Sequence, residues 1–255
     1  MSDVSAFIAS MPADYRIAFA DDGAAMMEHA AIVAQRGDRR SFTAKWSGNR
    51  DGATALCIVA EDSPGLFARI SSALVSHAID IVSAQAYCRE RGDGTVEAVD
   101  FLWIRRDDPL DARDVAAIGE LIDGLVRGVT NVEEKVRPSR RRPTGATRVR
   151  FDLDPASGAT ILTVEAGDRA GLLLQLTKTI FVARLQIVGL HAKSERGRAI
   201  DRFTVTELDG SPVSIERRLE LQVSILEAID ITGRSERSLS DTPSQRRRRP
   251  SAATR

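Results

Sequence analysis

Hydrophobic residues along the chain fall into two blocks with the same order of patterns. Each block opens on a short apolar run, Ala55–Ala60 in the first and Ile161–Val164 in the second. A run of this length predicts a buried strand, because a helix needs a longer segment. A stripe of apolar residues at helical spacing follows each run, formed by Leu66, Ile70 and Leu74 in the first block and by Leu172, Leu176 and Ile180 in the second.

Two more strand-like runs and a closing helical pattern complete each block. The first block has runs at 79–88 and 96–105 and a helix at about 111–126; the second has runs at 186–194 and 199–207 and a helix at about 215–229. Strand, helix, two strands and helix form the core of a split βαβ sandwich, in which helices cover one face of an antiparallel sheet. Alternating segments ahead of the blocks, Ser41–Trp46 and Arg148–Asp152, predict one further strand for each sheet.

The residues that separate strand from helix also repeat. Asp62-Ser63-Pro64-Gly65-Leu66-Phe67 is matched by Asp168-Arg169-Ala170-Gly171-Leu172-Leu173, at an offset of 168 − 62 = 106 residues. Ala98-Val99-Asp100 is matched by Ala199-Ile200-Asp201, at an offset of 201 − 100 = 101 residues. A period this long indicates a duplicated small domain rather than a solenoid.

The two copies resemble a tandem of ACT domains, which are small ligand-sensing modules of amino-acid metabolism. They resemble in particular the carboxy-terminal pair of the bacterial uridylyltransferase/uridylyl-removing enzymes of nitrogen control. The resemblance rests on the two Asp-x-x-Gly-Leu turns and on Ala199-Ile200-Asp201-Arg202-Phe203, and it covers roughly residues 42–230. It implies an α+β fold with two ferredoxin-like domains of the βαββαβ type, whose antiparallel sheets are covered by helices on one face.

Five segments are expected along the chain. They are an N-terminal helical segment (1–40), a first ACT domain (41–136), a basic linker (137–147), a second ACT domain (148–232) and a disordered basic tail (233–255). Val132–Val136 is a candidate for a further short strand of the first domain. Because the linker is short and contains proline, the two domains are expected to pack side by side, with one continuous sheet as the natural arrangement.

The two glycine turns are the candidate ligand sites. Asp62 or Asp168 can face the ammonium group of an amino acid, and the first amides of the helix, near Gly65-Leu66 or Gly171-Leu172, can receive its carboxylate. Glycine leaves room for the ligand because it has no Cβ. The alternative is structural: the aspartate caps the helix and the glycine only turns the chain.

The resemblance adds a second wall to each site. In ACT domains the turn forms the effector pocket together with the start of the second strand of a neighbouring module, where Asn is usual. Asp80 and Gln186 stand at those positions here. Pro64 restricts the first turn, whereas Arg169 can compete for Asp168 in the second, so the first pocket is expected to bind more tightly. By resemblance, glutamine is the first ligand expected.

Asp100 and Asp201 interrupt otherwise apolar strands. A buried carboxylate is costly without a partner. Each is therefore expected to meet an arginine near the end of the sheet or to face water on the open sheet surface, and a structural role is favoured over a functional one.

Candidate catalytic residues are not found, and no cofactor or metal is expected. The resembling enzymes use a nucleotidyltransferase domain and a His-Asp metal domain, and neither fits into the forty residues ahead of the first module. Asp152-Leu153-Asp154 leads directly into a turn, which favours a turn-capping role. None of the three histidines stands at nucleophile spacing from Ser or Cys, and His29 is expected to be exposed or half exposed, as a plain surface or packing residue rather than part of a site.

Composition restricts the cellular setting and the partners. Cys57 and Cys88 lack metal-type spacing and fit reduced thiols, and neither a spanning stretch nor a signal peptide is visible, so a cytoplasmic protein without a membrane partner is expected. Residues 1–135 hold 14 basic against 22 acidic residues, and the rest hold 22 against 14. Because the basic excess lies in the linker and the tail and aromatic residues make up only 5%, nucleic acid is not expected as a partner.

These observations favour a non-catalytic regulatory protein that senses a small amino acid. The alternative is a ligand-free scaffold or regulatory subunit, which contacts a separate enzyme or a second copy of itself through its sheet edges or its basic tail.

Overall fold

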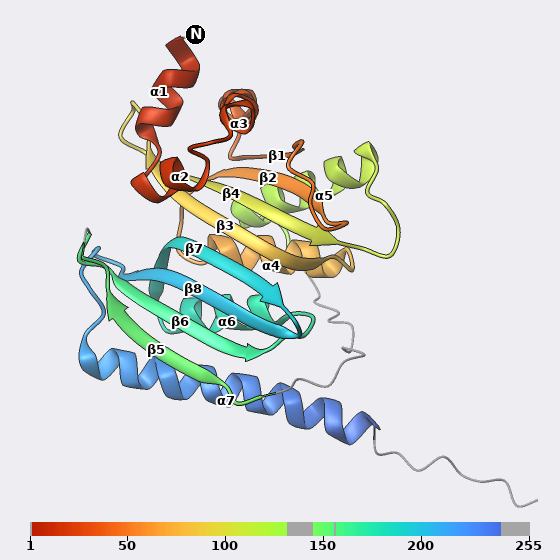
Figure 1. Cartoon of the computed structure of the whole chain (residues 1–255), viewed down its shortest axis with the longest axis vertical. Helices are drawn as coiled ribbons and strands as arrows, with labels where there is room; N and C mark the ends of the chain where they lie inside the picture. The colour runs from red at the N-terminus through yellow and green to blue at the C-terminus, as the bar shows by residue number, and fades with distance from the viewer. Residues whose placement is uncertain (1, 132–144, 156, 241–255) are drawn as a thin grey trace, which may run out of the picture.

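The computed structural model describes residues 2–131, 145–155 and 157–240, with side chains described between Val4 and Asp230. Its strands are β1 (Ser41–Lys45), β2 (Thr54–Glu61), β3 (Asp80–Glu90), β4 (Val96–Arg105), β5 (Arg148–Leu153), β6 (Thr160–Gly167), β7 (Leu185–Glu195) and β8 (Arg198–Glu207). Its helices are α1 (Ser2–Ser10), α2 (Ala13–Ala18), α3 (Gly23–Arg36), α4 (Leu66–Ser76), α5 (Ala112–Val126), α6 (Leu172–Val182) and α7 (Ile215–Ser240). The chain is of the α+β class, as expected (Figure 1).

All eight strands of the described residues join one antiparallel sheet, in the order β1-β2-β4-β3-β7-β8-β6-β5. Each half of the chain follows the order strand, strand, helix, strand, strand, helix, and is a ferredoxin-like, ACT-type unit. The strand that a βαββαβ fold places last comes first here, because β1 and β5 supply the outer strand of their halves. Both were predicted from the segments ahead of the repeats, whereas the candidate strand Val132–Val136 lies outside the described residues.

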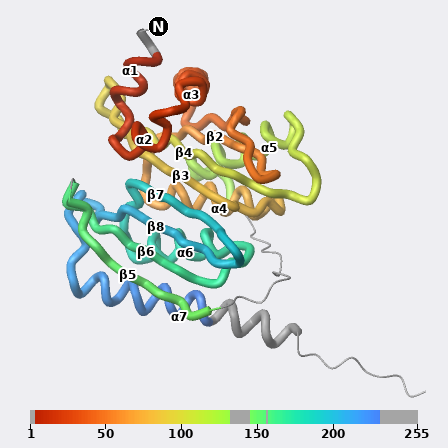
Figure 2. The backbone as a smooth tube through the Cα atoms, in the orientation of Figure 1, coloured from red at the N-terminus to blue at the C-terminus, as the bar shows by residue number. Residues whose placement is uncertain are grey.

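The two halves meet where β3 pairs with β7. Ala86 lies opposite Leu190 in this antiparallel register, and Ser83 Oγ donates a hydrogen bond of 2.9 Å to the Ala192 carbonyl. Near its start each of the two strands has a register shift against its other neighbour, between Ile81 and Ser83 in β3 and at the equivalent place in β7. A bulge of this kind changes the direction of a strand locally. The continuous sheet expected from the short linker is therefore observed (Figures 1 and 2).

The helices of the two repeats lie on one face of the sheet and cover a single core. Within this layer α4 contacts both α5 and α6, and α6 contacts α7, so that α4 and α6 meet over the β3–β7 seam. The core includes fully buried residues from both halves, such as Ile70, Leu102, Leu176 and Phe203. Burying apolar area on this scale is the main source of the fold's stability.

The N-terminal segment covers the opposite face of the first half, so that this half has helices on both faces (Figure 1). Its contacts form an aromatic cluster in which Tyr15 and His29 meet Trp46 and Phe101. His29 is fully buried rather than at the surface, and its Nδ1 lies 3.0 Å from the Tyr15 hydroxyl. Burial lowers the pKa of His29 to about 3, so the ring is neutral at physiological pH.

A buried ion-pair network fastens α3 to the sheet. Arg36 Nη1 lies 2.7 Å from Glu97 Oε1, and Arg89 Nη2 lies 2.6 Å from Glu97 Oε2. Arg36 and Glu97 are 6% and 1% exposed. Because one buried carboxylate is shared by two guanidinium groups, its charge is compensated on both oxygens.

The last helix differs from the expectation. α7 runs on to Ser240, past its expected end near Ile229, so the backbone of residues 233–240 is helical where disorder was expected. The remainder of the expected tail, 241–255, and most of the linker lie outside the described residues. Among the helices that are described, none combines the length and the apolar character needed to cross a membrane.

Candidate functional site

Two small pockets lie at the junction of the halves, and they are equivalent by the internal repeat. We call the one at the turn of the first half the first pocket; its walls include Asp62, Gly65, Leu66, Asp100 and Gln186. The second pocket, at the turn of the second half, has walls that include Asp168, Gly171, Leu172, Asp201 and Asp80. Each pocket thus combines the turn of one half with the start of the strand that follows the helix in the other half, β7 or β3, as the family resemblance implied.

The turns present their glycines and helix ends to the pockets. Gly65 and Gly171 have φ of 78° and 75°, in the left-handed region where glycine is favoured, and each is the residue from which the helix begins. Neither helix has a side-chain hydrogen bond at its N-cap. The N-cap residue of each helix is the glycine itself, so no side chain of the N-cap covers the first amides of the helix.

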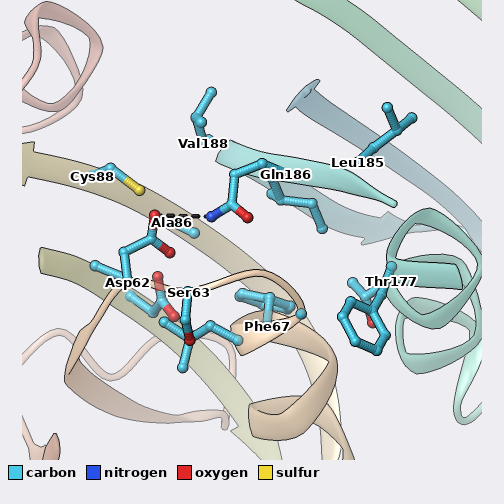
Figure 3. Close-up of a pocket in the computed structure, with 16 residues that line it drawn as sticks. Asp62, Ser63, Phe67, Ala86, Cys88, Thr177, Leu185, Gln186 and Val188 are labelled. Carbon is cyan, nitrogen blue, oxygen red and sulfur yellow. Dashed lines mark hydrogen bonds between the residues drawn. The ribbon is translucent and has the colours of Figure 1, made fainter. Parts of the chain in front are cut away.

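Asp62 accepts a hydrogen bond from the other half of the molecule. Its Oδ2 accepts a hydrogen bond of 2.9 Å from Gln186 Nε2 on β7 (Figure 3). It also accepts hydrogen bonds from the Ser63 amide and from the Cys88 thiol. Burial raises the pKa of Asp62 above its ordinary value, and these hydrogen bonds oppose the rise.

Gln186 has one polar group without a partner. Its Oε1 is buried and makes no hydrogen bond to any part of the chain that the structure describes. A buried, unpaired carbonyl costs free energy that a ligand's N–H group would recover. The first pocket therefore offers both an anionic acceptor, Asp62, and a neutral one, Gln186.

Asp100 and Asp201 lie on the helix-facing side of the sheet and line the first and second pocket, not the open face. They are 2% and 4% exposed. Burial, and secondarily the charge of Asp62, raises the pKa of Asp100 well above its ordinary value. Burial, and secondarily the charge of Asp168, raises the pKa of Asp201 to about 7. The expectation of an arginine partner or of water on the open sheet face is wrong for both residues, and their recurrence in the two repeats was the signal of a shared role.

Phe181 of α6 closes the first pocket. A Cβ built on Gly65 would lie 2.6 Å from a ring carbon of Phe181, so no side chain fits between the turn and this ring. The cavities measure about 20 Å³ and 30 Å³ in the first and second pocket, room for little more than a water-sized group. Phe181 is 44% exposed, so its ring lies between the first pocket and solvent.

Most predicted site residues gather at the pockets, but two behave differently from the expectation. Pro64 is exposed and does not line either described pocket, so it acts only on the shape of the turn. Arg169 is 6% exposed and donates hydrogen bonds to Gln175 Oε1 and to the Ile229 carbonyl, which tie the second turn to α7. Two further residues line the pockets and were not predicted. Thr177 of α6 lines the first pocket, and Ser71 of α4 lines the second.

Residues considered for catalysis have structural partners. Asp154 Oδ2 accepts hydrogen bonds from the Ser157 amide and hydroxyl, which confirms the turn role of this carboxylate. In the described residues no group of three or more His, Cys, Asp or Glu side chains is arranged to hold a metal ion. Cys57 and Cys88 are both free thiols, on strands separated by β4.

Comparison with known proteins gives one consistent relationship. The chain is similar to the bifunctional uridylyltransferase/uridylyl-removing enzyme of Nitrobacter hamburgensis, with 34% identity over 179 residues, which is 66% of the chain and 18% of that enzyme. It is similar to the enzyme of the same name from Novosphingobium aromaticivorans, with 32% identity over 206 residues, 76% of the chain and 22% of the enzyme. The Caulobacter vibrioides enzyme is 28% identical over 238 residues, 88% of the chain and 24% of the enzyme.

The chain therefore corresponds to about a fifth of the length of these relatives. The similarity agrees with the resemblance to their carboxy-terminal region and supports a regulatory role. No protein-family model matches the chain.

Proposed function

We propose that this chain is a regulatory module that binds a small amino acid at its two pockets, with glutamine as the first candidate, and that it has no catalytic role of its own. The observation that carries the proposal is the composition of each pocket: a carboxylate and a glycine at a helix start from one half, and a polar strand residue from the other. On the same proposal it acts in the cytoplasm, in nitrogen metabolism.

The first pocket suggests how an amino acid is held. Asp62 pairs with the ammonium group, and the N-terminal end of α4 receives the carboxylate, because free amides and the helix dipole favour an anion there. The side-chain amide of glutamine donates to Gln186 Oε1, which has no partner among the described residues. Glutamate lacks this donor at neutral pH.

Binding is coupled to the packing of the two halves. Gln186 bonds Asp62 across the seam, and Phe181 of the second half lies against Gly65 of the first. A ligand that pairs with Asp62 competes with Gln186 and displaces Phe181. Occupancy therefore alters contacts between the halves, which is the difference between states that a regulatory signal requires.

Titration calorimetry with glutamine tests the proposal, with Gly65→Ala and Gly52→Ala as a matched pair of variants. Both glycines have left-handed backbone, with φ of 78° and 71°, but a Cβ at residue 52 meets nothing within 4 Å. Gly65→Ala should weaken glutamine binding at least tenfold, while Gly52→Ala should leave it unchanged. Absence of binding by any standard amino acid in the wild-type protein would refute the proposal.

A second candidate function, contact with another protein without a ligand, is favoured by one surface. Ile215, Leu219 and Val223 form a stripe along α7 and are 70%, 60% and 54% exposed. β5, which α7 contacts, is one of the two outer strands of the described sheet. Sedimentation velocity distinguishes the two functions. A stable assembly whose size no amino acid changes, and which dissociates in the Leu219→Glu variant, would favour the contact function.

A further inference from the structure

The two pockets differ at the position contributed by the other half. Gln186 and Asp80 are equivalent in the repeat, 186 − 80 = 106 residues apart, and lie at the start of β7 and β3, the strands that follow α6 and α4. The first pocket therefore receives a neutral amide, whereas the second receives a carboxylate. This single exchange gives the second pocket three aspartates, Asp80, Asp168 and Asp201, where the first has two.

Electrostatics shows that these carboxylates act on one another. Removal from water, and then the charge of Asp168, raises the pKa of Asp80 to about 6, although Arg105 opposes the rise. Burial, and after it the charge of the same Asp168, raises the pKa of Asp201. Two cations line the same pocket but have other partners: Lys193 Nζ lies 3.1 Å from Glu195 Oε1, and Arg169 donates to α7.

A buried hydroxyl provides an independent sign of a ligand. Ser71 of α4 is fully buried and lines the second pocket, and its Oγ has no hydrogen-bond partner in the described part of the chain. Its equivalent in the first pocket, Thr177, donates a hydrogen bond of 3.0 Å to the Leu174 carbonyl. Among the described residues, only the second pocket therefore combines three aspartates with a buried hydroxyl that has no hydrogen-bond partner.

We infer that the second pocket binds a ligand with two positive charges, a basic amino acid or a diamine, while the first takes a neutral amino acid. The inference rests on the proposed function. One ammonium group lies between Asp168 and Asp201 and donates to Ser71 Oγ. The second ammonium group pairs with Asp80, which lines the pocket where β3 begins. Opposite charge within a few ångströms relieves the repulsion among the three aspartates.

Calorimetry on the full chain with lysine, putrescine and glutamine tests this assignment. Asp80→Gln introduces into the second pocket the residue of the first, and Gln186→Asp makes the reciprocal change. Lysine should bind the wild type at least tenfold more tightly than it binds Asp80→Gln, and the affinity of the first pocket for glutamine should remain the same. Gln186→Asp should gain a second lysine site. Putrescine, which has no carboxylate, shows whether the dication alone is sufficient.

Unchanged lysine affinity in Asp80→Gln overturns the inference, because the cation then binds elsewhere. Glutamine binding without any binding of lysine or putrescine also overturns it, while the proposed function stands. Failure of every ligand to bind overturns both. The melting temperature of each variant, compared with that of the wild type, confirms that loss of binding is not loss of folding; Asp80→Asn, which preserves shape, repeats the test if Asp80→Gln does not fold.

Discussion

Gln186 and Asp62 are joined by a hydrogen bond of 2.9 Å although 124 residues separate them in the chain. The carboxylate that we expect to pair with a ligand's ammonium group thus accepts a hydrogen bond from the other half of the molecule. This contact is the most direct physical link between the first pocket and the packing of the halves. Its removal has consequences for both stability and binding.

Replacement of Gln186 by methionine removes the donor and keeps a similar volume. At pH 8 the free energy of unfolding should fall by about 1–3 kcal/mol, because Asp62 loses a hydrogen bond to its charged form in a half-buried site. Urea unfolding measures the change. In an Asp62→Asn background the same replacement should cost less; an equal cost in both backgrounds would show that the bond contributes nothing.

Replacement of Asp201 by asparagine should alter the dependence of stability on pH. The pKa of Asp201 is about 7 in the folded protein, against an ordinary value of 3.8. The folded state therefore holds this proton more tightly than the unfolded state, and stability is lost as the pH rises from about 3.8 through 7. Asp201→Asn lacks this loss, so its stability relative to the wild type should rise by roughly 2–3 kcal/mol between pH 5 and pH 8.

The control for this measurement is Asp152→Asn, which changes an exposed carboxylate of β5 that pairs with Arg150. Its stability relative to the wild type should vary by less than about 0.5 kcal/mol over the same range, as is usual for exposed ion pairs. If the free energies of unfolding of Asp201→Asn and of the wild type changed in parallel between pH 5 and pH 8, Asp201 would be ionised in the folded protein over that whole range. That result would contradict its burial.

Local patterns were sufficient to predict the repeats, because each strand-to-helix turn combines an apolar run, an aspartate and a glycine within a few residues. They also predicted the continuous sheet, since a short linker restricts how far two modules can separate. Pairing Asp62 with Gln186 depended on the family resemblance, because no local rule connects residues on different modules. Phe181 shows the limit: its position over Gly65 follows only from how α6 meets the first half.

The environments predicted for His29 and Asp100 were wrong for a common reason. Each was assigned by its polarity to water or to a charged partner, but tertiary packing supplied another environment. His29 is enclosed by aromatic rings of α2, β4 and the β1–β2 connection, and a neutral imidazole is stable there because it accepts or donates to Tyr15. Asp100 faces a pocket, which is the arrangement in which a costly buried carboxylate is retained for binding.

The chain should not transfer or remove uridylyl groups. The relatives that carry those names are about five times longer than the matched segment, and Asp154, the carboxylate considered for catalysis, accepts hydrogen bonds within a turn. Incubation of the pure protein with labelled UTP, Mg²⁺ and a candidate acceptor protein should leave the acceptor unlabelled. Labelling of the acceptor that continues steadily with time and increases with the concentration of this protein would contradict the proposal of a non-catalytic module.

The Arg36–Glu97 pair should decide whether residues 1–40 are an integral part of the first half. Arg36→Met removes one charge-assisted hydrogen bond from the buried Glu97 carboxylate, which keeps its contacts to Arg89 and Arg91, so the free energy of unfolding should fall by about 1.5–3 kcal/mol. Arg40→Met, which breaks the exposed pair with Glu61, should cost less than about 1 kcal/mol. Urea unfolding followed by tryptophan fluorescence is well suited to the comparison, because Trp46 contacts His29 under the same helices. A loss no larger in Arg36→Met than in Arg40→Met would show that α3 is not fastened through this network, and that the aromatic cluster alone holds the segment on the sheet.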